Sequence, residues 1–345
     1  MFQWIYQKLD PLSQKRVRHF AKIKRAKWSL IFISICFLLS LFAEFLANSK
    51  PLFVSYKGQY FVPVVKTYKG TDFDGPFIVE PNYKEIKEQI EKHGFMIEPL
   101  IWWGYNESNR ELDNYPSPPS STNLLGTDDR GRDVLVRILY GFRLSVGFAI
   151  AALICAMILG TLIGGLQGFF GGKLDLFGQR FVEMWVSLPS IFVIILVVNV
   201  FEPSVFLLMV CMVAFLWIGT QYYVRGECLR LKNKDFALAA ASFGASKWQI
   251  FTSHIVPNAI TPMVTLAPFV MNQAILFLSF LDYIGLGVQP PTASLGELLR
   301  QGRDNFLNAW WLAFYPFFAL VGTLLLLNFI GEGVRKAFDP RAEHN

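Results

Sequence analysis

Six long apolar runs constrain the fold of this chain more than any other feature of its sequence. About 20 apolar residues are enough to cross a bilayer as a helix, and a helix satisfies its backbone hydrogen bonds without water. The runs lie near residues 28–47, 144–168, 180–201, 203–224, 259–281 and 310–331. We therefore predict an all-α polytopic membrane protein with six transmembrane helices.

The composition supports the membrane class. Only 17% of the residues are charged and 53% are hydrophobic, whereas soluble proteins carry about 25% charged residues. The first run follows a basic segment, but it is longer than the apolar part of a signal peptide and lacks a small-residue cleavage site, so we interpret it as a retained helix. The cysteines lie in or beside apolar runs and suggest no disulfide or metal site: Cys36, Cys155, Cys211 and Cys228.

The positions of lysine and arginine predict the orientation. Residues 1–27 hold eight of them and 225–257 hold five, whereas the short loops of the opposite side hold only Arg300 and Arg303. Because positive charge is retained on the cytoplasmic side, both termini are expected there. The positive charge then serves orientation and contact with anionic membrane lipids, so nucleic acid is not an expected partner.

These spans divide the chain into six parts. We predict a cytoplasmic basic segment at 1–27, a first transmembrane helix at 28–47, an extracytoplasmic insertion at 48–122, an outer segment at 123–143 leading into the second helix, a core at 144–335 with a cytoplasmic loop at 225–258, and a cytoplasmic tail at 336–345.

Glycines recur every four residues in the second predicted helix, at Gly160, Gly164, Gly168 and Gly172. This spacing places them on one face and predicts close packing against another helix. Three polar residues fall at membrane depth in other runs: Asn199, Asn272 and Gln273. Such residues either line a pathway or form hydrogen bonds between helices, and the sequence leaves both open.

Catalytic and nucleotide-binding motifs are not evident. GFFGGKL at 168–174 lacks the spacing and the Ser or Thr of a phosphate-binding loop, and it follows a predicted helix rather than a strand. We predict a chain that is not an enzyme and holds no metal and no cofactor of its own.

The cytoplasmic loop 225–258 contains the sequence LAAASFGASKWQIFTSHIVPN. Asn233 or Asp235 can cap a helix there, and Pro257-Asn258 is expected to stop one before the next apolar run. One interpretation is an amphipathic helix on the membrane surface. The other is a helix whose small residues allow close docking of a soluble partner.

This stretch resembles the EAA loop of ABC importer permeases, in which EAA is followed by glycine and then by HIxPN. Ala239, Ala240 and Gly244 match the first part, and His254, Pro257 and Asn258 match the end. Leu238 occupies the position of the usual glutamate, which is a departure from the pattern.

Three further stretches resemble the second permease of dipeptide and oligopeptide importers. They are 123–146, 284–306 and 328–341, in the expected order and on the expected sides. The enlarged loop 48–122 is similar to that of the microcin C/oligopeptide-type permeases. It is either a folded spacer or a contact surface for a substrate-binding protein.

The resemblance implies a five-helix type I importer core preceded by one extra helix. It implies a second permease, two cytoplasmic ATPases that bind ATP and Mg, an extracytoplasmic binding protein, and import of peptides (or nickel) by alternating access. The residues that would couple the permease to the ATPases are Phe236, Ala239, Ala240, Phe243, Gly244, Lys247, His254, Pro257 and Asn258. The alternatives are a self-sufficient channel or secondary transporter, and a membrane-anchored enzyme whose active domain is loop 48–122.

Overall fold

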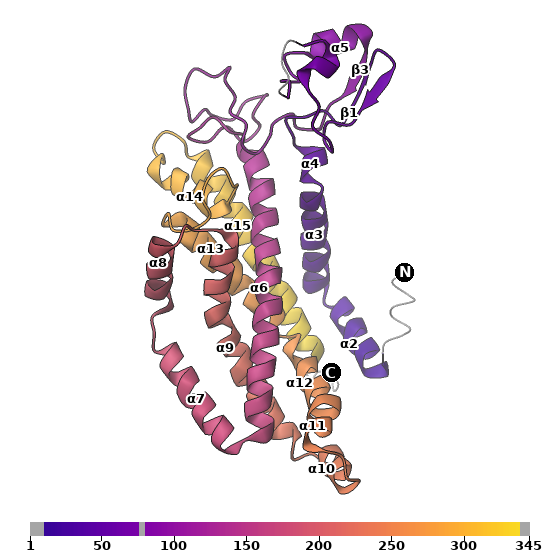
Figure 1. Ribbon diagram of the computed structural model, residues 1–345, viewed down its shortest axis with the longest axis vertical. Coiled ribbons are helices and arrows are strands. Elements are labelled where there is room, and N and C mark those ends of the chain that lie inside the picture. Colours follow the sequence, from indigo (N-terminus) through magenta and orange to yellow (C-terminus); the bar gives the residue numbers. More distant parts are fainter. Residues whose placement is uncertain (1–9, 76–79, 339–345) are drawn as a thin grey trace.

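The computed structural model describes residues 10–75 and 80–338, which form an elongated helical bundle with a small folded cap at one end (Figure 1). Three helices are each long and apolar enough to cross a membrane: α6 (Val134–Phe170), α9 (Val205–Leu231) and α15 (Trp311–Phe338). Two bent pairs pass the same test together, α7 (Gly172–Val186) with α8 (Ser190–Val200) at 72° and Lys247–Met263 with α13 (Ala267–Tyr283) at 60°.

Of the six expected spans, the described residues therefore show three as straight helices, and five if each bent pair is one span. The first expected span falls on a shorter helix that does not meet the same test. That shorter helix, α3 (Lys24–Leu41), packs along α15 and α6 but has three basic residues in its first turn. It is preceded by α2 (Pro11–Lys22) and followed by α4 (Ala43–Leu46).

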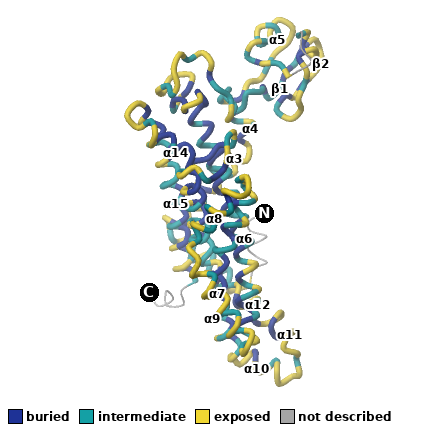
Figure 2. Tube along the Cα trace, turned by 60° about the vertical axis from the view of Figure 1, so that its left-hand side comes forward, coloured by how far each residue is buried: buried dark blue, intermediate teal, exposed yellow. Residues whose placement is uncertain are grey.

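The core of the bundle is formed by apolar side chains from α6, α8, α9, α13 and α15. Ala152, Leu208, Leu278 and Leu327 are almost completely buried in it. Figure 2 shows buried positions along the bundle and around α14, and mostly exposed ones at α10. The bundle is thus held by ordinary side-chain packing, while the end at α10 is left open to partners or solvent.

The closest helix pair is α6 with α9, and glycines make this approach possible. A Cβ atom on Gly160, Gly164 or Gly168 would lie 2.8 Å from Trp217 O, 2.4 Å from Gln221 O and 2.4 Å from Arg225 O, respectively. The three glycines of α6 and the three contacted residues of α9 both repeat every four residues, so the backbone of one helix runs directly along that of the other. Gly172 is not part of this row, because α6 ends at Phe170 and Gly172, with a φ of 61°, begins α7.

Replacing Gly164 with valine is expected to destabilise the protein by about 1–3 kcal/mol, because the new side chain meets backbone that cannot rotate away. The thermal midpoint of the detergent-solubilised chain measures this effect. The matched control is Gly219→Val on α9, where a new Cβ atom meets nothing within 4 Å. Equal midpoints for the two variants would contradict close α6–α9 packing.

The segment between α4 and α6 forms the cap and contains the described β-structure. Strands β1 (Phe53–Tyr56), β2 (Gln59–Phe61) and β3 (Gly94–Ile97) form an antiparallel sheet in the order β2-β1-β3, with a 3-10 turn at Gly70–Phe73 and helix α5 (Lys87–His93) beside it. Its own core contains Val54, Phe61, Phe73, Tyr83 and Ile90. The all-α prediction is therefore wrong for this segment.

The physical reason is local. Lys57 and Gly58, with φ values of 48° and 79°, form a two-residue turn between β1 and β2. A turn with positive φ at both central residues matches the twist of a hairpin, and aromatic and β-branched residues flank it on both sides.

The predicted boundaries shift at two helices. The second long helix begins at Val134 rather than near 144, because Asp133 caps it by accepting a hydrogen bond from Val136 N at 2.9 Å. The segment 123–143 is therefore part loop and part helix. The last helix continues to Phe338, and the remainder of the expected tail, 339–345, lies outside the described residues.

Candidate functional site

The end of the bundle opposite the cap is formed by a chain of short helices (Figure 1). They are α10 (Asp235–Ser242), α11 (Lys247–Ile250), a π-helical turn η2 (Phe251–Ile255) and α12 (Val256–Met263). The N-cap of α10 is Lys234 without a side-chain bond, so neither Asn233 nor Asp235 caps it as expected. Gly244, with a φ of 83°, turns the chain from α10 to α11, a conformation that favours glycine.

Helix α10 buries one small residue and exposes its large ones. Ala237 is buried and Ala240 is half-buried, and both belong to the apolar cluster that also contains Val224 and Cys228 of α9. Phe243 is 91% exposed, and Phe236, Leu238 and Ala239 are also exposed. The exposed face is thus more bulky and apolar than the alanine-rich sequence suggested. We call Phe236, Leu238, Ala239 and Phe243 the α10 face.

Two contacts hold the end of α9, just before α10, to the neighbouring helices. Lys232 Nζ donates a hydrogen bond to Gly168 O at 3.0 Å. Arg225 forms a bidentate ion pair with Asp175, with N–O distances of 2.5 and 2.7 Å. Such planar pairs define both distance and orientation. The end of α9 is therefore fixed to the ends of α6 and α7 just before α10 begins.

Helix α11 docks on the end of α6 through aromatic rings. The Trp248 ring stacks on Phe170 with centroids 6.3 Å apart, and the buried Phe251 packs against Phe169 and Phe170. Trp248 is still 59% exposed, and Lys247 is exposed beside it. This aromatic contact extends the apolar surface from α10 toward the bundle.

The expectation that Pro257-Asn258 stops a helix is wrong. The helix runs from Lys247 to Met263, with Pro257 in the first turn of α12. The wider π turn before it accommodates the missing proline N–H, and Asn258 Nδ2 donates to His254 O at 2.6 Å across that turn. The helix instead breaks at 264–266, just after Pro262.

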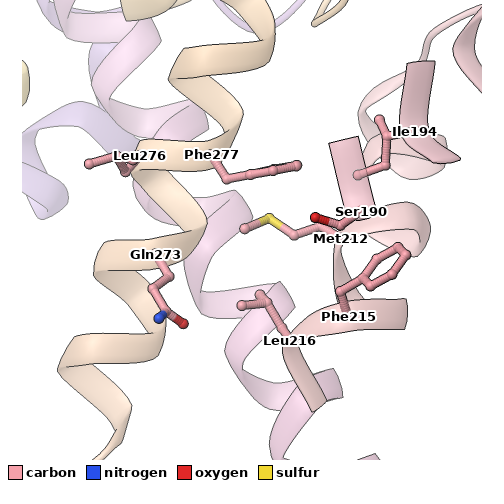
Figure 3. A pocket seen from close by; sticks show the side chains of 8 residues that line it. All are labelled: Ser190, Ile194, Met212, Phe215, Leu216, Gln273, Leu276 and Phe277. Atoms are coloured by element: carbon pink, nitrogen blue, oxygen red, sulfur yellow. The ribbon is translucent and has the colours of Figure 1, made fainter. Parts of the chain in front are cut away.

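An open pocket of about 290 Å³ lies between α8, α9 and α13, and its lining residues Gln273 and Leu276 are exposed. Figure 3 shows Gln273 and Phe277 of α13 on one side and Met212 and Leu216 of α9 on the other. The complete lining is Ser190, Ile194, Met212, Phe215, Leu216, Gln273, Leu276 and Phe277. Except for Gln273, these residues carried no sequence signal, since most are ordinary apolar residues of a span.

The three polar residues expected at membrane depth have different surroundings. Gln273 lines this cavity. Asn272 instead donates hydrogen bonds to Asn328 Oδ1 at 2.9 Å and Leu324 O at 3.3 Å on α15, and Asn199 donates to Ile195 O within its own helix. Helix-to-helix and intrahelical bonding thus accounts for two of the three.

The opposite end carries a buried polar network that begins in the loop before α6. Asp128 is completely buried and accepts hydrogen bonds from Arg132 Nε at 2.8 Å and from the backbone N–H groups of Arg130 and Arg132. The buried Arg137 lies 3.3 Å from the same carboxylate and also donates to Tyr105 O and Thr292 O. One carboxylate therefore lies within ion-pair distance of two buried guanidinium groups and balances one of their two positive charges.

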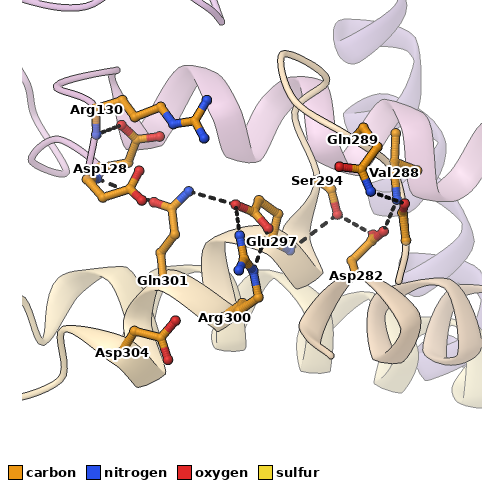
Figure 4. A network of polar contacts seen from close by, with 12 residues as sticks. Asp128, Arg130, Asp282, Val288, Gln289, Ser294, Glu297, Arg300, Gln301 and Asp304 are labelled. Carbon is orange, nitrogen blue, oxygen red and sulfur yellow. Dashed lines mark hydrogen bonds and ion pairs between the residues drawn. The ribbon is translucent and has the colours of Figure 1, made fainter. Parts of the chain in front are cut away.

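The network continues across α14 (Leu295–Asp304), as Figure 4 shows. Gln301 accepts from Asp129 N at 3.4 Å and donates to Glu297 at 3.1 Å, and Arg300 pairs with Glu297 at 2.8 Å. Ser294 then donates to Asp282, which also accepts from Val288 N. The network joins the loop before α6, helix α14 and the end of α13.

Burial changes the ionisation of two carboxyls in this loop. It raises the pKa of Asp129, with a further contribution from the neighbouring Asp128 charge. Burial also raises the pKa of Asp133, although hydrogen bonds from Val136 and Asn123 oppose it. The site residues expected from the sequence include none of this network, although the charge density of GTDDRGRD just before a spanning helix was a usable signal.

Several spans in one bundle, a polar cavity residue and an apolar face at one end together define a polytopic membrane protein of the transporter class. Residues 156–344 match the family described as "Binding-protein-dependent transport system inner membrane component". The chain belongs to this family, as its motifs predicted. The predicted role, permease subunit of an ABC transport system in the inner membrane, is confirmed.

Relatives match over nearly the whole chain. The inner membrane ABC transporter permease protein YejE of Escherichia coli is 42% identical, covering 96% of this chain and 98% of its own length. The peptidoglycan transport system permease protein YejE of Agrobacterium fabrum is 38% identical, covering 96% and 94%. The oligopeptide permease OppC of Haemophilus influenzae is 40% identical over 64% of this chain and 70% of its own.

Among solved structures, a chain of the MetNI methionine ABC transporter in an inward-facing conformation is similar at 16% identity. It covers 59% of this chain and 97% of its own length, with a TM-score of 0.46. Among the described residues no cluster of histidine, cysteine and acidic side chains could hold a metal ion.

Proposed function

We propose that this chain is one of two permease subunits of an importer for peptides or peptide-like compounds in the bacterial inner membrane. The names of its relatives support this substrate class, since they include oligopeptide, dipeptide and peptidoglycan transport systems. The relatives that match 96% of the chain span the cap region as well. ATP and Mg are bound by two partner ATPases, and a binding protein delivers the substrate from outside.

The proposed topology has six spans with both termini in the cytoplasm. Helix α3 is the first span, and the bent pairs α7–α8 and Lys247–Met263 with α13 each form one. The end with α10 is cytoplasmic, because the basic residues gather there. The cap is then outside, where the exposed sheet residues Tyr60 and Phe95 are available to the binding protein.

The observation that carries the proposal is the α10 face. Phe243, which directly follows α10, is 91% exposed, and α10 lies at the tip of the bundle (Figure 1). Contact with a soluble partner removes such a ring from water and contributes about 25 cal/mol per Å² of apolar surface. Leu238 adds an apolar contact where the family pattern has a glutamate, so this docking contact relies on burial rather than on an ion pair.

The geometry provides a route for alternating access. ATP-driven closure of the ATPases displaces α10 and α11, and the continuous helix Lys247–Met263 carries the displacement to the 60° break before α13. Helix α13 places Gln273 in the open pocket beside α8 and α9 and Asn272 against α15. The nucleotide can shift this equilibrium only through its different affinity for the two states.

Other residues of the expected coupling set have supporting roles. Gly244 makes the turn that separates α10 from α11. His254 and Asn258 stabilise the π turn through their hydrogen bond, and Pro257 follows that turn. Lys247 is exposed and adds positive charge beside the docking face.

Affinity purification of the tagged full-length chain from membranes of its native host tests the proposal. We expect an ATPase and a second permease of similar size to purify with it, identified by mass spectrometry. A chain that purifies alone or as a homo-oligomer, and that transports in liposomes without ATP, would instead establish a self-sufficient channel or secondary transporter.

A further inference from the structure

Two adjoining cavities lie beside α6 at the cap end of the bundle. One, of about 480 Å³, is lined mainly by polar residues of the cap and of α4, and the other, of about 560 Å³, continues along α6 toward α9. They share Glu44, Tyr105 and Tyr140. Their sizes are those of ligand sites, which span about 300–1,000 Å³. None of these residues belongs to the open pocket beside α8 and α9 or to the α10 face.

The shared part lies at the boundary of the membrane. Glu44 is the first charged residue after the uncharged stretch 28–43, and Arg143 is the last before the uncharged stretch 144–172. Arg143 Nη1 donates to both oxygens of Glu44 at 2.8 and 2.9 Å, so the two boundaries are at the same level. Tyr105 stacks on Tyr140 at 4.9 Å beside the pair, and tyrosines are typical of the headgroup region.

From this ion pair an apolar groove runs along α6 into the spanning region. Leu144, Gly147 and Ala151 line it on one side and Val205 and Met209 of α9 on the other. A Cβ atom on Gly147 would meet nothing within 4 Å. The groove is therefore open at this glycine, beside the apolar core of the bilayer.

The Glu44–Arg143 ion pair can form further hydrogen bonds with a ligand that carries both a positive and a negative charge. Only Nη1 of Arg143 donates a hydrogen bond among the described residues, so its Nε and Nη2 groups are free to donate. Both Glu44 oxygens accept from that single nitrogen and keep further lone pairs. The neighbouring charges are paired: Lys50 with Glu80 at 2.6 Å and Glu107 with Lys84 at 2.8 Å. The site therefore matches a zwitterion.

We propose that these cavities bind one phospholipid with a zwitterionic ethanolamine headgroup. Its phosphate accepts hydrogen bonds from Arg143, its ammonium donates to Glu44, and one acyl chain lies in the groove at Gly147. Anionic lipids lack the ammonium group that would donate to Glu44, and they bring a negative charge beside this carboxylate without a positive one. This lipid links α4, α6 and α9 at the level of the headgroups, and the inference goes beyond the transport function.

Native mass spectrometry of the complete detergent-purified assembly tests the proposal, with phosphatidylethanolamine and phosphatidylglycerol as probes. We expect one phosphatidylethanolamine to remain bound per copy of this chain, in preference to phosphatidylglycerol. Gly147→Leu adds a side chain to the groove at a position where a Cβ atom meets nothing within 4 Å, and it is expected to weaken this binding about tenfold. Glu44→Gln is expected to weaken it by a similar factor of about ten, since it removes a charge-assisted bond.

The matched control is Gly322→Leu on α15, which adds the same side chain where a Cβ atom also meets nothing within 4 Å. This variant should retain the lipid as the unmodified protein does. Equal retention by Gly147→Leu, or equal or better retention of phosphatidylglycerol by the unmodified protein, would overturn the proposal. Normal thermal midpoints for the variants show that loss of lipid is not loss of fold.

Discussion

Replacing Asp128 with alanine is expected to destabilise the protein by about 3–5 kcal/mol, because it leaves buried positive charge without its partner. Asp128 and Arg137 are completely buried and Arg132 nearly so. The same carboxylate accepts two backbone N–H groups of its own loop, so its removal also leaves these donors unpaired. The thermal midpoint and the yield of detergent-solubilised protein measure the effect.

The adjacent residue provides the control. The Asp129 side chain is 39% exposed and lies 3.9 Å from Arg132, so Asp129→Ala removes the same charge one position away at a cost of about 1 kcal/mol or less. If both variants unfold at the same temperature, the network does not depend on Asp128. The comparison is clean because the two substitutions are chemically identical and differ mainly in burial.

Replacing Phe243 with aspartate is expected to abolish recovery of the ATPase with this chain while the permease stays folded and inserted. The ring is 91% exposed, so its removal costs little within the subunit. At an interface, loss of a central aromatic residue costs about 2 kcal/mol or more, equivalent to about 30-fold in affinity. Quantitative mass spectrometry of the purified complex, with ATP hydrolysis in the same sample, measures the outcome.

Leu307→Asp is the matched control for this variant. Leu307 is 97% exposed and lies in the loop between α14 and α15, at the other end of the bundle. It should leave ATPase recovery unchanged. Normal ATPase recovery with Phe243→Asp would show that the α10 face is not the docking surface. Loss with both variants would indicate general disruption of the assembly.

Hydropathy located the spans because a bilayer requires long apolar helices whatever their tertiary neighbours are. It also placed Gly160, Gly164 and Gly168 on one face, since helical periodicity is local. The cap was missed for a different reason. Its strands are only three or four residues long, and the turn at Lys57-Gly58 is a short signal that indicates a hairpin only together with the strands on both sides.

Other features depend on residues far apart in the chain. The sequence near Pro257 does not indicate that the helix continues past this proline by means of a π turn. The residue that begins this turn, Phe251, packs against Phe169 and Phe170 at the end of α6, far away in the chain. Likewise, the sequence alone does not distinguish Asn272 from Gln273, which are adjacent. Only the position of Asn328 on α15 explains why one forms a hydrogen bond between helices and the other lines a cavity.

The amino-acid sequence by itself determined the membrane class, the family and the location of α10, since each follows from composition, charge or a short motif. The tertiary structure alone decided which faces are exposed. Phe236 and Leu238 of α10 are exposed while Ala237 joins the apolar cluster that contains Val224 and Cys228 of α9, and Glu44 meets Arg143 because α4 and α6 end their uncharged stretches side by side. Exposure and pairing of this kind arise from packing between distant segments, which no local pattern encodes.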